Sequence, residues 1–309
     1  MAARYRALLL VPVLAALGCG DTWDRIGFGG AGTASGGASG GSIATAGTAA
    51  TGPAPDAGTA PDPCDALDLL FVVENGPDNQ LVLANLTANI ALLADYLQGS
   101  DAAWTADFHV AFTPARDTGR PCGAPGDLSI DPSGGGPCAT AGGGPFASET
   151  DGDGLADTLA CLANLPEVPA DTAPALAGAA TRALGRPLPG DTVPDAACGA
   201  GFFRPQALHA VVLVTSTDDP GGGAGSPGAP ADWHAALADL EAPETGSALA
   251  LFALAPDPAD PPGCAPPAAN VLDWLARHEH AASSDWCLFA DGPAQWVSNA
   301  AAEIDALCP

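Results

Sequence analysis

The chain has 309 residues, and its 36 acidic side chains against nine Arg and no Lys give a formal net charge of −27. So acidic a chain repels phosphate backbones and anionic lipid surfaces, which argues against nucleic acid as a partner and leaves divalent cations and cationic partners as compatible ones. The alternative is that the Asp residues only keep an apolar, Ala-rich protein soluble.

The first 19 residues have the layout of a secretory signal. Arg4 and Arg6 precede an apolar run from Ala7 to Leu17, which is too short for a permanent membrane helix. The run ends in ALGC, which resembles the bacterial lipobox, where the Cys becomes the lipidated first residue. We expect a signal peptide over residues 1–18 and a lipid anchor on Cys19 that holds the protein in the cell envelope, at the outer membrane or cell surface. An ordinary cleavable signal is the alternative.

Residues 27–62 consist mostly of Gly, Ala, Ser, Thr and Pro. Such a segment buries too little apolar surface to offset the entropy of ordering. We predict a lipidated N-terminus and flexible linker over residues 19–63, followed by one folded domain over residues 64–309.

Apolar strands alternate with helices from residue 64 onward. Runs of large apolar residues between turn residues indicate strands buried on both faces, as in parallel sheets. The predicted strands cover residues 67–73, 108–113, 207–215, 248–254 and 286–289. The predicted helices cover residues 79–97, 155–164, 172–184, 230–240, 269–278 and 294–307, with an irregular excursion over 114–150. This order predicts an α/β fold with a doubly wound, mostly parallel sheet flanked by helices.

Eight Cys remain when Cys19 is set aside, and an even number in an exported chain indicates disulfides. None forms a CxxC pair and His is scarce, so the sequence gives little support for a zinc site. His278 and His280 fall on different sides of a predicted helix, as expected of a surface cluster. We expect disulfides between sequence neighbours around one loop or helix. These are Cys122–Cys138, Cys161–Cys198 and Cys264–Cys287.

Two segments resemble the von Willebrand factor type A (vWA) family. DLLFVVENGPD, from Asp68 to Asp78, looks like the opening of the vWA domains of exported bacterial lipoproteins. CGAGFFRP, from Cys198 to Pro205, looks like the family segment that precedes a strand ending in an acidic loop. The resemblance implies a Rossmann-like sheet with a central first strand. It also implies a Cys64–Cys308 disulfide, because the last helix then packs near that strand.

In the vWA family a Mg²⁺ or Ca²⁺ ion lies at the top of the sheet, held by oxygen ligands. Glu74 stands where the family has Asp, and Gly76 and Asp78 stand where it has two Ser. Glu74 is one methylene longer than Asp, so its carboxylate would lie elsewhere. A rearranged metal site and a site that has lost its metal are both compatible with these changes. The candidate ligands are Glu74, Asp78, Thr172, Ser216 and Asp218, and we expect Glu74, Asp78 and Asp218 on one loop face.

A second candidate cation site is ETDGDGLAD, from Glu149 to Asp157. Its oxygen-bearing residues and its Gly resemble calcium loops of the DxDxDG kind, with Asp151, Asp153 and Asp157 as candidate ligands. It lacks a Glu at the twelfth position, which is Ala160. The alternative is a turn whose Asp residues cap the following helix.

These patterns predict a non-enzymatic surface or periplasmic lipoprotein. Its degenerate vWA-like domain would act as a binding, adhesion or structural module with an unknown protein partner, and Mg²⁺ or Ca²⁺ is the only cofactor suggested. An exported hydrolase on a similar sheet is the second hypothesis. It would need a pocket with a positioned nucleophile and base, and no Ser-His-Asp or paired-carboxylate layout in the sequence supports it.

Overall fold

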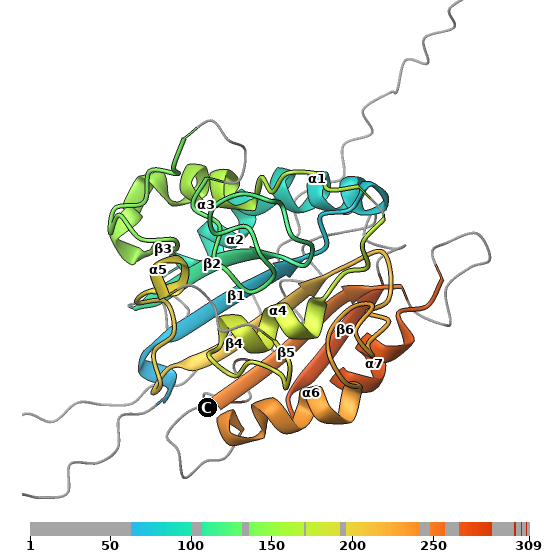
Figure 1. The fold of residues 1–309 in the computed structure, drawn as a ribbon. Coiled ribbons are helices and arrows are strands. Elements are labelled where there is room, and N and C mark those ends of the chain that lie inside the picture. The colour runs from blue at the N-terminus through green and yellow to red at the C-terminus, as the bar shows by residue number, and fades with distance from the viewer. Residues whose placement is uncertain are drawn as a thin grey trace, which may run out of the picture. The chain divides into compact units, whose positions relative to one another are not determined.

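Strand β1 (Leu67–Val73) occupies the interior of a six-stranded sheet (Figure 1). The computed structural model describes residues 63–99, 107–131, 136–169, 171–191, 196–241, 248–256 and 266–285, together with residues 300, 304 and 307. The other strands are β2 (Phe108–Pro114), β3 (Ala147–Ser148), β4 (Leu208–Val214), β5 (Ala248–Ala255) and β6 (Ala281–Asp285). Their order is β3-β2-β1-β4-β5-β6, and only β3 pairs antiparallel. The prediction of a mostly parallel sheet is confirmed.

Alternate residues of β1 enter two different cores. Leu69 and Phe71 belong to one core, where the ring of Phe71 stacks 4.8 Å from that of Phe112 in β2. Leu70 and Val72 belong to the other core. Every residue of β1 is buried. A strand covered on both faces needs apolar residues in succession, which explains why the sequence here does not alternate between apolar and polar.

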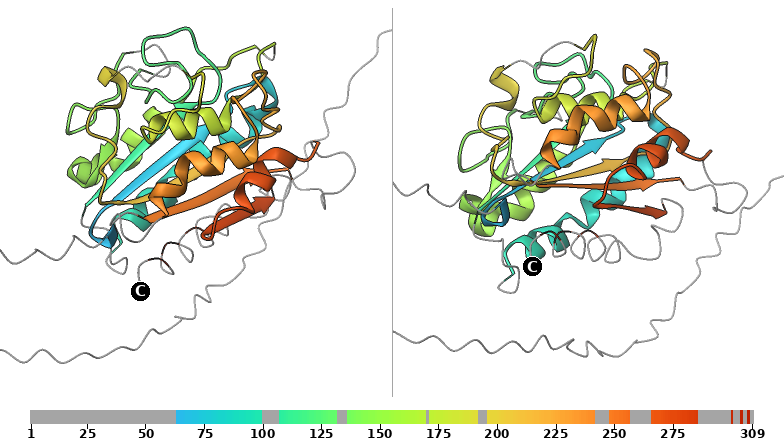
Figure 2. Two further views of the ribbon diagram at one scale, coloured as in Figure 1. Left: turned by 60° about the horizontal axis from the view of Figure 1, so that its bottom comes forward. Right: turned by 90° about the horizontal axis from the view of Figure 1, so that it is seen from below.

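The helices form one layer on each face of the sheet, as Figure 2 shows. The layer on the Phe71 face contains α1 (Gln80–Ala88), α2 (Ile90–Leu97) and α3 (Leu155–Ala163). The layer on the Leu70 face contains α4 (Leu176–Ala183), α6 (Pro230–Leu237) and α7 (Ala269–Leu275). Short helical segments are α5 (Ala196–Gly199) and the 3-10 helices η1 (Pro63–Asp65), η2 (Pro77–Asn79), η3 (Glu149–Gly154) and η4 (Ala238–Leu240). The doubly wound arrangement is therefore as predicted. Among the described residues, no helix combines the length and the apolar character that crossing a membrane requires.

Several elements differ from their predicted bounds, and α6 and α7 each end three residues earlier than expected. The helix predicted over residues 79–97 is broken at Asn89, whose side-chain amide donates to the Asn85 carbonyl at 2.8 Å and so competes with the backbone. The helix predicted from residue 172 begins only at Leu176, because Pro174 disfavours helical backbone before it. The last described strand, β6, precedes the strand predicted at residues 286–289, which lies outside the described residues.

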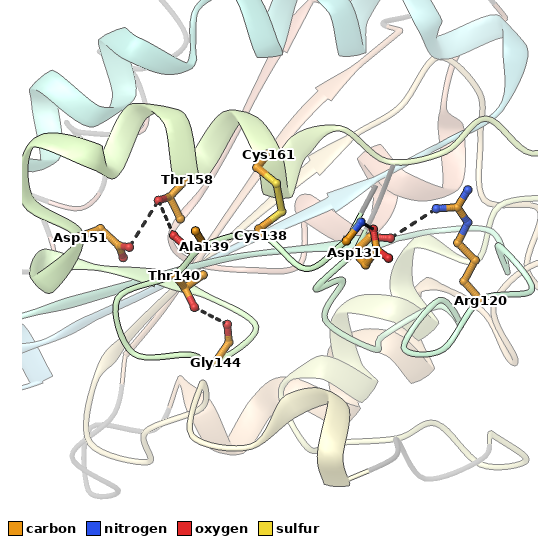
Figure 3. Close-up of a disulfide and its surroundings, with 10 residues drawn as sticks. Arg120, Asp131, Cys138, Ala139, Thr140, Gly144, Asp151, Thr158 and Cys161 are labelled. Atoms are coloured by element: carbon orange, nitrogen blue, oxygen red, sulfur yellow. Dashed lines mark hydrogen bonds between the residues drawn. A yellow bond between two sulfur atoms is a disulfide. The ribbon is translucent and has the colours of Figure 1, made fainter. Parts of the chain in front are cut away.

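Two disulfides fasten the excursion between β2 and α3, and their pairing corrects the prediction. Cys122 bonds Cys198 and Cys138 bonds Cys161, with Cα separations of 5.2 and 5.8 Å. The predicted pairs Cys122–Cys138 and Cys161–Cys198 are therefore wrong. Figure 3 shows Cys138 beside Cys161 of α3.

The reason for this pairing is that the two halves of the excursion lie against different helices. The backbone N–H of Leu128 donates to the Cys198 carbonyl at 3.1 Å, which holds the first half of the excursion against α5. The Thr158 hydroxyl of α3 donates to the Ala139 carbonyl at 3.2 Å, which holds the second half against α3. Each Cys of the excursion thus meets a Cys from a different helix.

The remaining cysteines are only partly described. Cys64 is disulfide-bonded, and its sulfur lies 3.6 Å from the carbonyl oxygen of Leu307. Its predicted partner Cys308 lies outside the described residues, so that pairing stays a prediction. The predicted pair Cys264–Cys287 and the lipidation site Cys19 also lie outside them.

Candidate functional site at the carboxyl edge of the sheet

The loops that follow β1, β2 and β4 meet at the carboxyl edge of the sheet. Parallel pairing puts the ends of these strands level, with Val73 opposite both Pro114 and Val214. The N–H of Glu74 donates to the Val214 carbonyl, and the N–H of Ala115 donates to the Val73 carbonyl, each at 2.8 Å. This edge is where open α/β sheets carry their ligand sites.

Glu74 is fully buried at this edge, and both oxygens of its carboxylate accept several hydrogen bonds. Oε1 accepts from Arg116 Nη2 at 2.7 Å and from the Thr217 hydroxyl at 3.0 Å. Oε2 accepts from the Thr215 hydroxyl at 2.7 Å, from the backbone N–H groups of Ser216 and Thr217, and from the Ser216 hydroxyl. Burial alone would raise the pKa of Glu74, but bonds from Thr215, Arg116 and Ser216 outweigh it and lower that pKa. Glu74 is therefore a buried carboxylate anion whose acceptor sites are in use.

Arg116 supplies the positive charge beside Glu74. Its side chain is only 5% exposed, and a second donor, Nη1, bonds the backbone carbonyl of Thr172. Gly76 makes room for the guanidinium, because a Cβ at that position would lie 3.1 Å from its carbon and nitrogen atoms. The guanidinium of Arg116 thus occupies space that is free because residue 76 has no side chain.

Asn75 connects three loops around this ion pair through hydrogen bonds. Its side-chain oxygen accepts from the N–H of Arg116 at 3.0 Å, and its amide donates to the Pro166 carbonyl at 3.1 Å. Its own carbonyl accepts from the N–H of Val168 at 2.9 Å. The segment after α3 is consequently fixed beside Glu74 and Arg116.

The two acids after β4 bind backbone groups of the helices that begin at this edge. Asp218 accepts from the N–H groups of Asn270 and Val271, at the start of α7. Asp219 is fully buried and accepts from the N–H of Ala177 in α4 and from the Ser226 hydroxyl, at 3.1 and 2.5 Å. A carboxylate at a helix N-terminus satisfies unpaired N–H groups and the helix dipole. Both acids therefore have structural partners.

The candidate metal ligands of this edge lie on neighbouring loops but do not converge on one point. Ser216 donates to Glu74, and Thr172 presents its carbonyl to Arg116. Asp218 caps α7, while Asp78 is exposed in η2. Because the guanidinium of Arg116 already neutralises Glu74, this donor set does not fit a divalent cation.

The Asp residues of the candidate calcium loop do not cap α3 as the alternative predicts, since Gly154 precedes α3 and no side chain caps this helix. Asp151 and Ser148 form a capping box at the start of η3, with Oδ2 of Asp151 accepting from the Ser148 N–H at 2.8 Å. The other oxygen of Asp151 accepts from the N–H of Ala141 at 2.8 Å. Figure 3 shows Asp151 turned toward Thr158 of α3. Asp153 and Asp157 are exposed.

A second buried cluster of titratable groups lies at the opposite edge of the sheet, and no motif of the sequence indicates it. Asp68 accepts from the N–H and Nε of Arg204, at 2.8 and 2.7 Å. Arg204 also pairs with Asp107. His209 is fully buried, with Nδ1 3.5 Å from Asp68. Burial raises the pKa of Asp68 to about 6 against the pull of Arg204, and burial lowers the pKa of His209 to about 4. Asp68 and Arg204 both lie in the segments that resemble the vWA family.

No protein-family model matches the sequence, and the curated proteins contain no significant match. A structural search aligns the chain with proximal thread matrix protein 1 (PTMP1) from the mussel byssus. The sequences are 11% identical and the TM-score is 0.37, over 79% of this chain and 47% of that protein. The aligned part thus spans about half of that protein's length.

Proposed function

We propose that the protein is a non-enzymatic, lipid-anchored module of the bacterial cell envelope. Its vWA-like domain binds a cationic protein partner at the carboxyl edge of the sheet without a metal ion. The observation that carries this proposal is the buried ion pair between Glu74 and Arg116, 2.7 Å apart. An internal cation stands beside the acid that follows β1, so the edge needs no divalent ion to balance that charge.

An acidic rim surrounds the ion pair and supports a cationic partner. We define the rim by four exposed residues, Asp78, Asp117, Glu167 and Asp171. Asp117 follows Arg116 directly. Glu167 lies between two residues that bond Asn75, and Asp171 precedes Thr172, which bonds Arg116. Carboxylates that share one edge create a local negative potential, which attracts basic surfaces and speeds their association. The formal charge of −27 strengthens this field.

The experiment measures binding of a short oligo-lysine peptide to the full chain by fluorescence anisotropy, at low salt and with a chelator present. The rim variant carries Asp78→Asn, Asp117→Asn and Asp171→Asn. The control carries Asp95→Asn, Asp153→Asn and Asp157→Asn, which remove the same charge from exposed positions of α2, η3 and α3. The control positions lie near the other edge, because β3, just before η3, pairs with the start of β2, and Gln98 bonds Gly152.

We expect the rim variant to bind the peptide about tenfold more weakly, because a rim charge acts mainly through steering and local potential. The control should stay within about twofold of wild type, and 0.15 M salt should weaken wild-type binding by screening. Equal losses in both variants would assign the binding to net charge alone. A requirement for Mg²⁺ or Ca²⁺ would contradict the metal-independent edge.

A further inference from the structure

Three metal-binding side chains meet where the end of α6 lies beside the end of α7. His234 is in α6, Glu241 follows η4, and His278 lies three residues past the end of α7. Nδ1 of His278 is 2.6 Å from Oε1 of Glu241, and Nε2 of His234 is 3.5 Å from Oε2. One ligand atom from each residue falls within 4.8 Å of the others. No other group of three or more His, Cys, Asp or Glu residues in the described parts of the chain meets this distance.

A rigid apolar frame holds these residues together. Trp233 and Trp274 are fully buried and pack edge to face, with ring centroids 5.9 Å apart. His234 follows Trp233, and His278 lies four residues after Trp274, so the contact between α6 and α7 brings the two imidazoles together. The two imidazole rings lie 4.8 Å apart. The site is therefore built by packing of tryptophans that the sequence alone does not pair.

The hydrogen bonding of this cluster is incomplete. The side chain of His278 is fully buried, yet its Nε2 has no hydrogen-bond partner among the described residues. Glu241 differs from Glu74, because its ion-pair partners in the described structure are the two histidines and not an Arg.

We propose that His234, Glu241 and His278 form a site for a divalent transition-metal ion, with Zn²⁺ as the ion that this donor set favours. Two imidazoles and one carboxylate are a ligand set that zinc takes in proteins, with water at the fourth position. The site goes beyond the proposed function, since it lies on the α6–α7 contact and uses none of the rim residues. Its effect is to fasten the end of η4 to the end of α7.

The geometry needs only small adjustments to accept the ion. Ligand atoms of a tetrahedral zinc site lie about 3.3 Å apart, given Zn–N and Zn–O distances near 2.0–2.1 Å. The 2.6 Å contact must therefore open slightly and the longest separation must close. His234 and Glu241 are 32% and 22% exposed and can change rotamer, whereas His278 is held by its burial. Their exposure also gives the ion and its water ligand a route from solvent.

The experiment titrates ZnCl₂ into the full chain, with its disulfides formed and without a polyhistidine tag, by isothermal calorimetry. Thermal unfolding is followed in parallel with Zn²⁺, Mg²⁺ or Ca²⁺, and Co²⁺ serves as a spectroscopic probe of the ligand field. The variants are His234→Ala and Glu241→Gln, both at partly exposed positions. The matched control is His280→Ala, which removes a partly exposed His two residues from His278.

We expect one Zn²⁺ per chain and a rise of several degrees in the unfolding midpoint, which Mg²⁺ and Ca²⁺ do not produce. His234→Ala and Glu241→Gln should weaken Zn²⁺ binding at least about 100-fold and abolish the Co²⁺ absorption bands, because each removes one of three ligands. His280→Ala should bind as wild type does. Absence of Zn²⁺ binding by wild type, or equal binding by wild type and His234→Ala, would overturn the proposal. The second result would assign the ion to surface carboxylates.

Discussion

The guanidinium of Arg116 lies 2.7 Å from the carboxylate of Glu74, directly after the first strand. The resemblance to the vWA family places a metal ion at this edge. In this protein a residue that follows β2 brings a positive charge to the same acid. Glu74 is an anion, and the positive charge beside it belongs to a side chain of the protein itself.

Removal of Arg116 should destabilise the protein strongly. Arg116→Met leaves Glu74 buried without its charge partner, and we expect a loss of about 3–5 kcal/mol in the free energy of unfolding. Glu74→Gln combined with Arg116→Met removes both charges and should cost less than the sum of the single changes. Urea unfolding of the wild type, the two single variants and the double variant measures the coupling energy between the two side chains. Additive costs would show that the two side chains do not act as a pair.

The buried pair of Asp68 and His209 should make stability depend on pH between about 4 and 6.5. The pKa of His209 falls from 6.5 to about 4 on folding, so the unfolded chain takes up this proton first and stability is lost as pH falls through that window. The pKa of Asp68 rises from 3.8 to about 6, so its contribution has the opposite sign and diminishes as pH rises.

Substitutions at these two positions separate the two contributions. His209→Leu should make the protein lose less stability than wild type between pH 6.5 and 4.5, by at most about 3 kcal/mol. Asp68→Asn should make it lose more, because the compensating proton uptake is gone. Urea unfolding at both pH values tests this. Parallel pH profiles for all three proteins would refute the assignment.

The two described disulfides should contribute unequally to stability. Residues 122 and 198 are 76 apart in sequence and residues 138 and 161 are 23 apart, so the chain-entropy model gives about 4.5 and 3.4 kcal/mol. The Cys122→Ser/Cys198→Ser variant should therefore unfold at a lower denaturant concentration than the Cys138→Ser/Cys161→Ser variant. Peptide mapping without reduction should recover the same two pairs, and recovery of Cys122 linked to Cys138 would contradict the structure.

Lipidation of Cys19 predicts where the protein is found in the cell. The full chain should fractionate with the envelope membrane, and Cys19→Ser should be recovered in the soluble fraction, because one residue carries the anchor. Detergent phase partitioning provides an independent readout. A wild-type protein that is wholly soluble would leave the ordinary cleavable signal as the explanation.

The sequence by itself determined the four long parallel strands β1, β2, β4 and β5 and the class of fold. β1 runs from Leu67 to Val73 as predicted, because a strand covered on both faces must be apolar at successive positions and turn residues must follow it. β6 was not predicted, since AASSD at an edge has no such run. A short strand of small and polar residues becomes a strand only through pairing with β5.

The tertiary structure alone decided what each acid and each cysteine binds. Arg116 is 42 residues from Glu74, and they meet because β1 and β2 pair in parallel with their ends level. Cys138 bonds Cys161 because the second half of the excursion lies along α3. The shorter sequence distance from Cys138 to Cys122 does not determine the pairing. His278 meets His234 through the packing of two tryptophans. A local pattern records which residues are buried, but partners across the fold depend on register and packing, which no short segment contains.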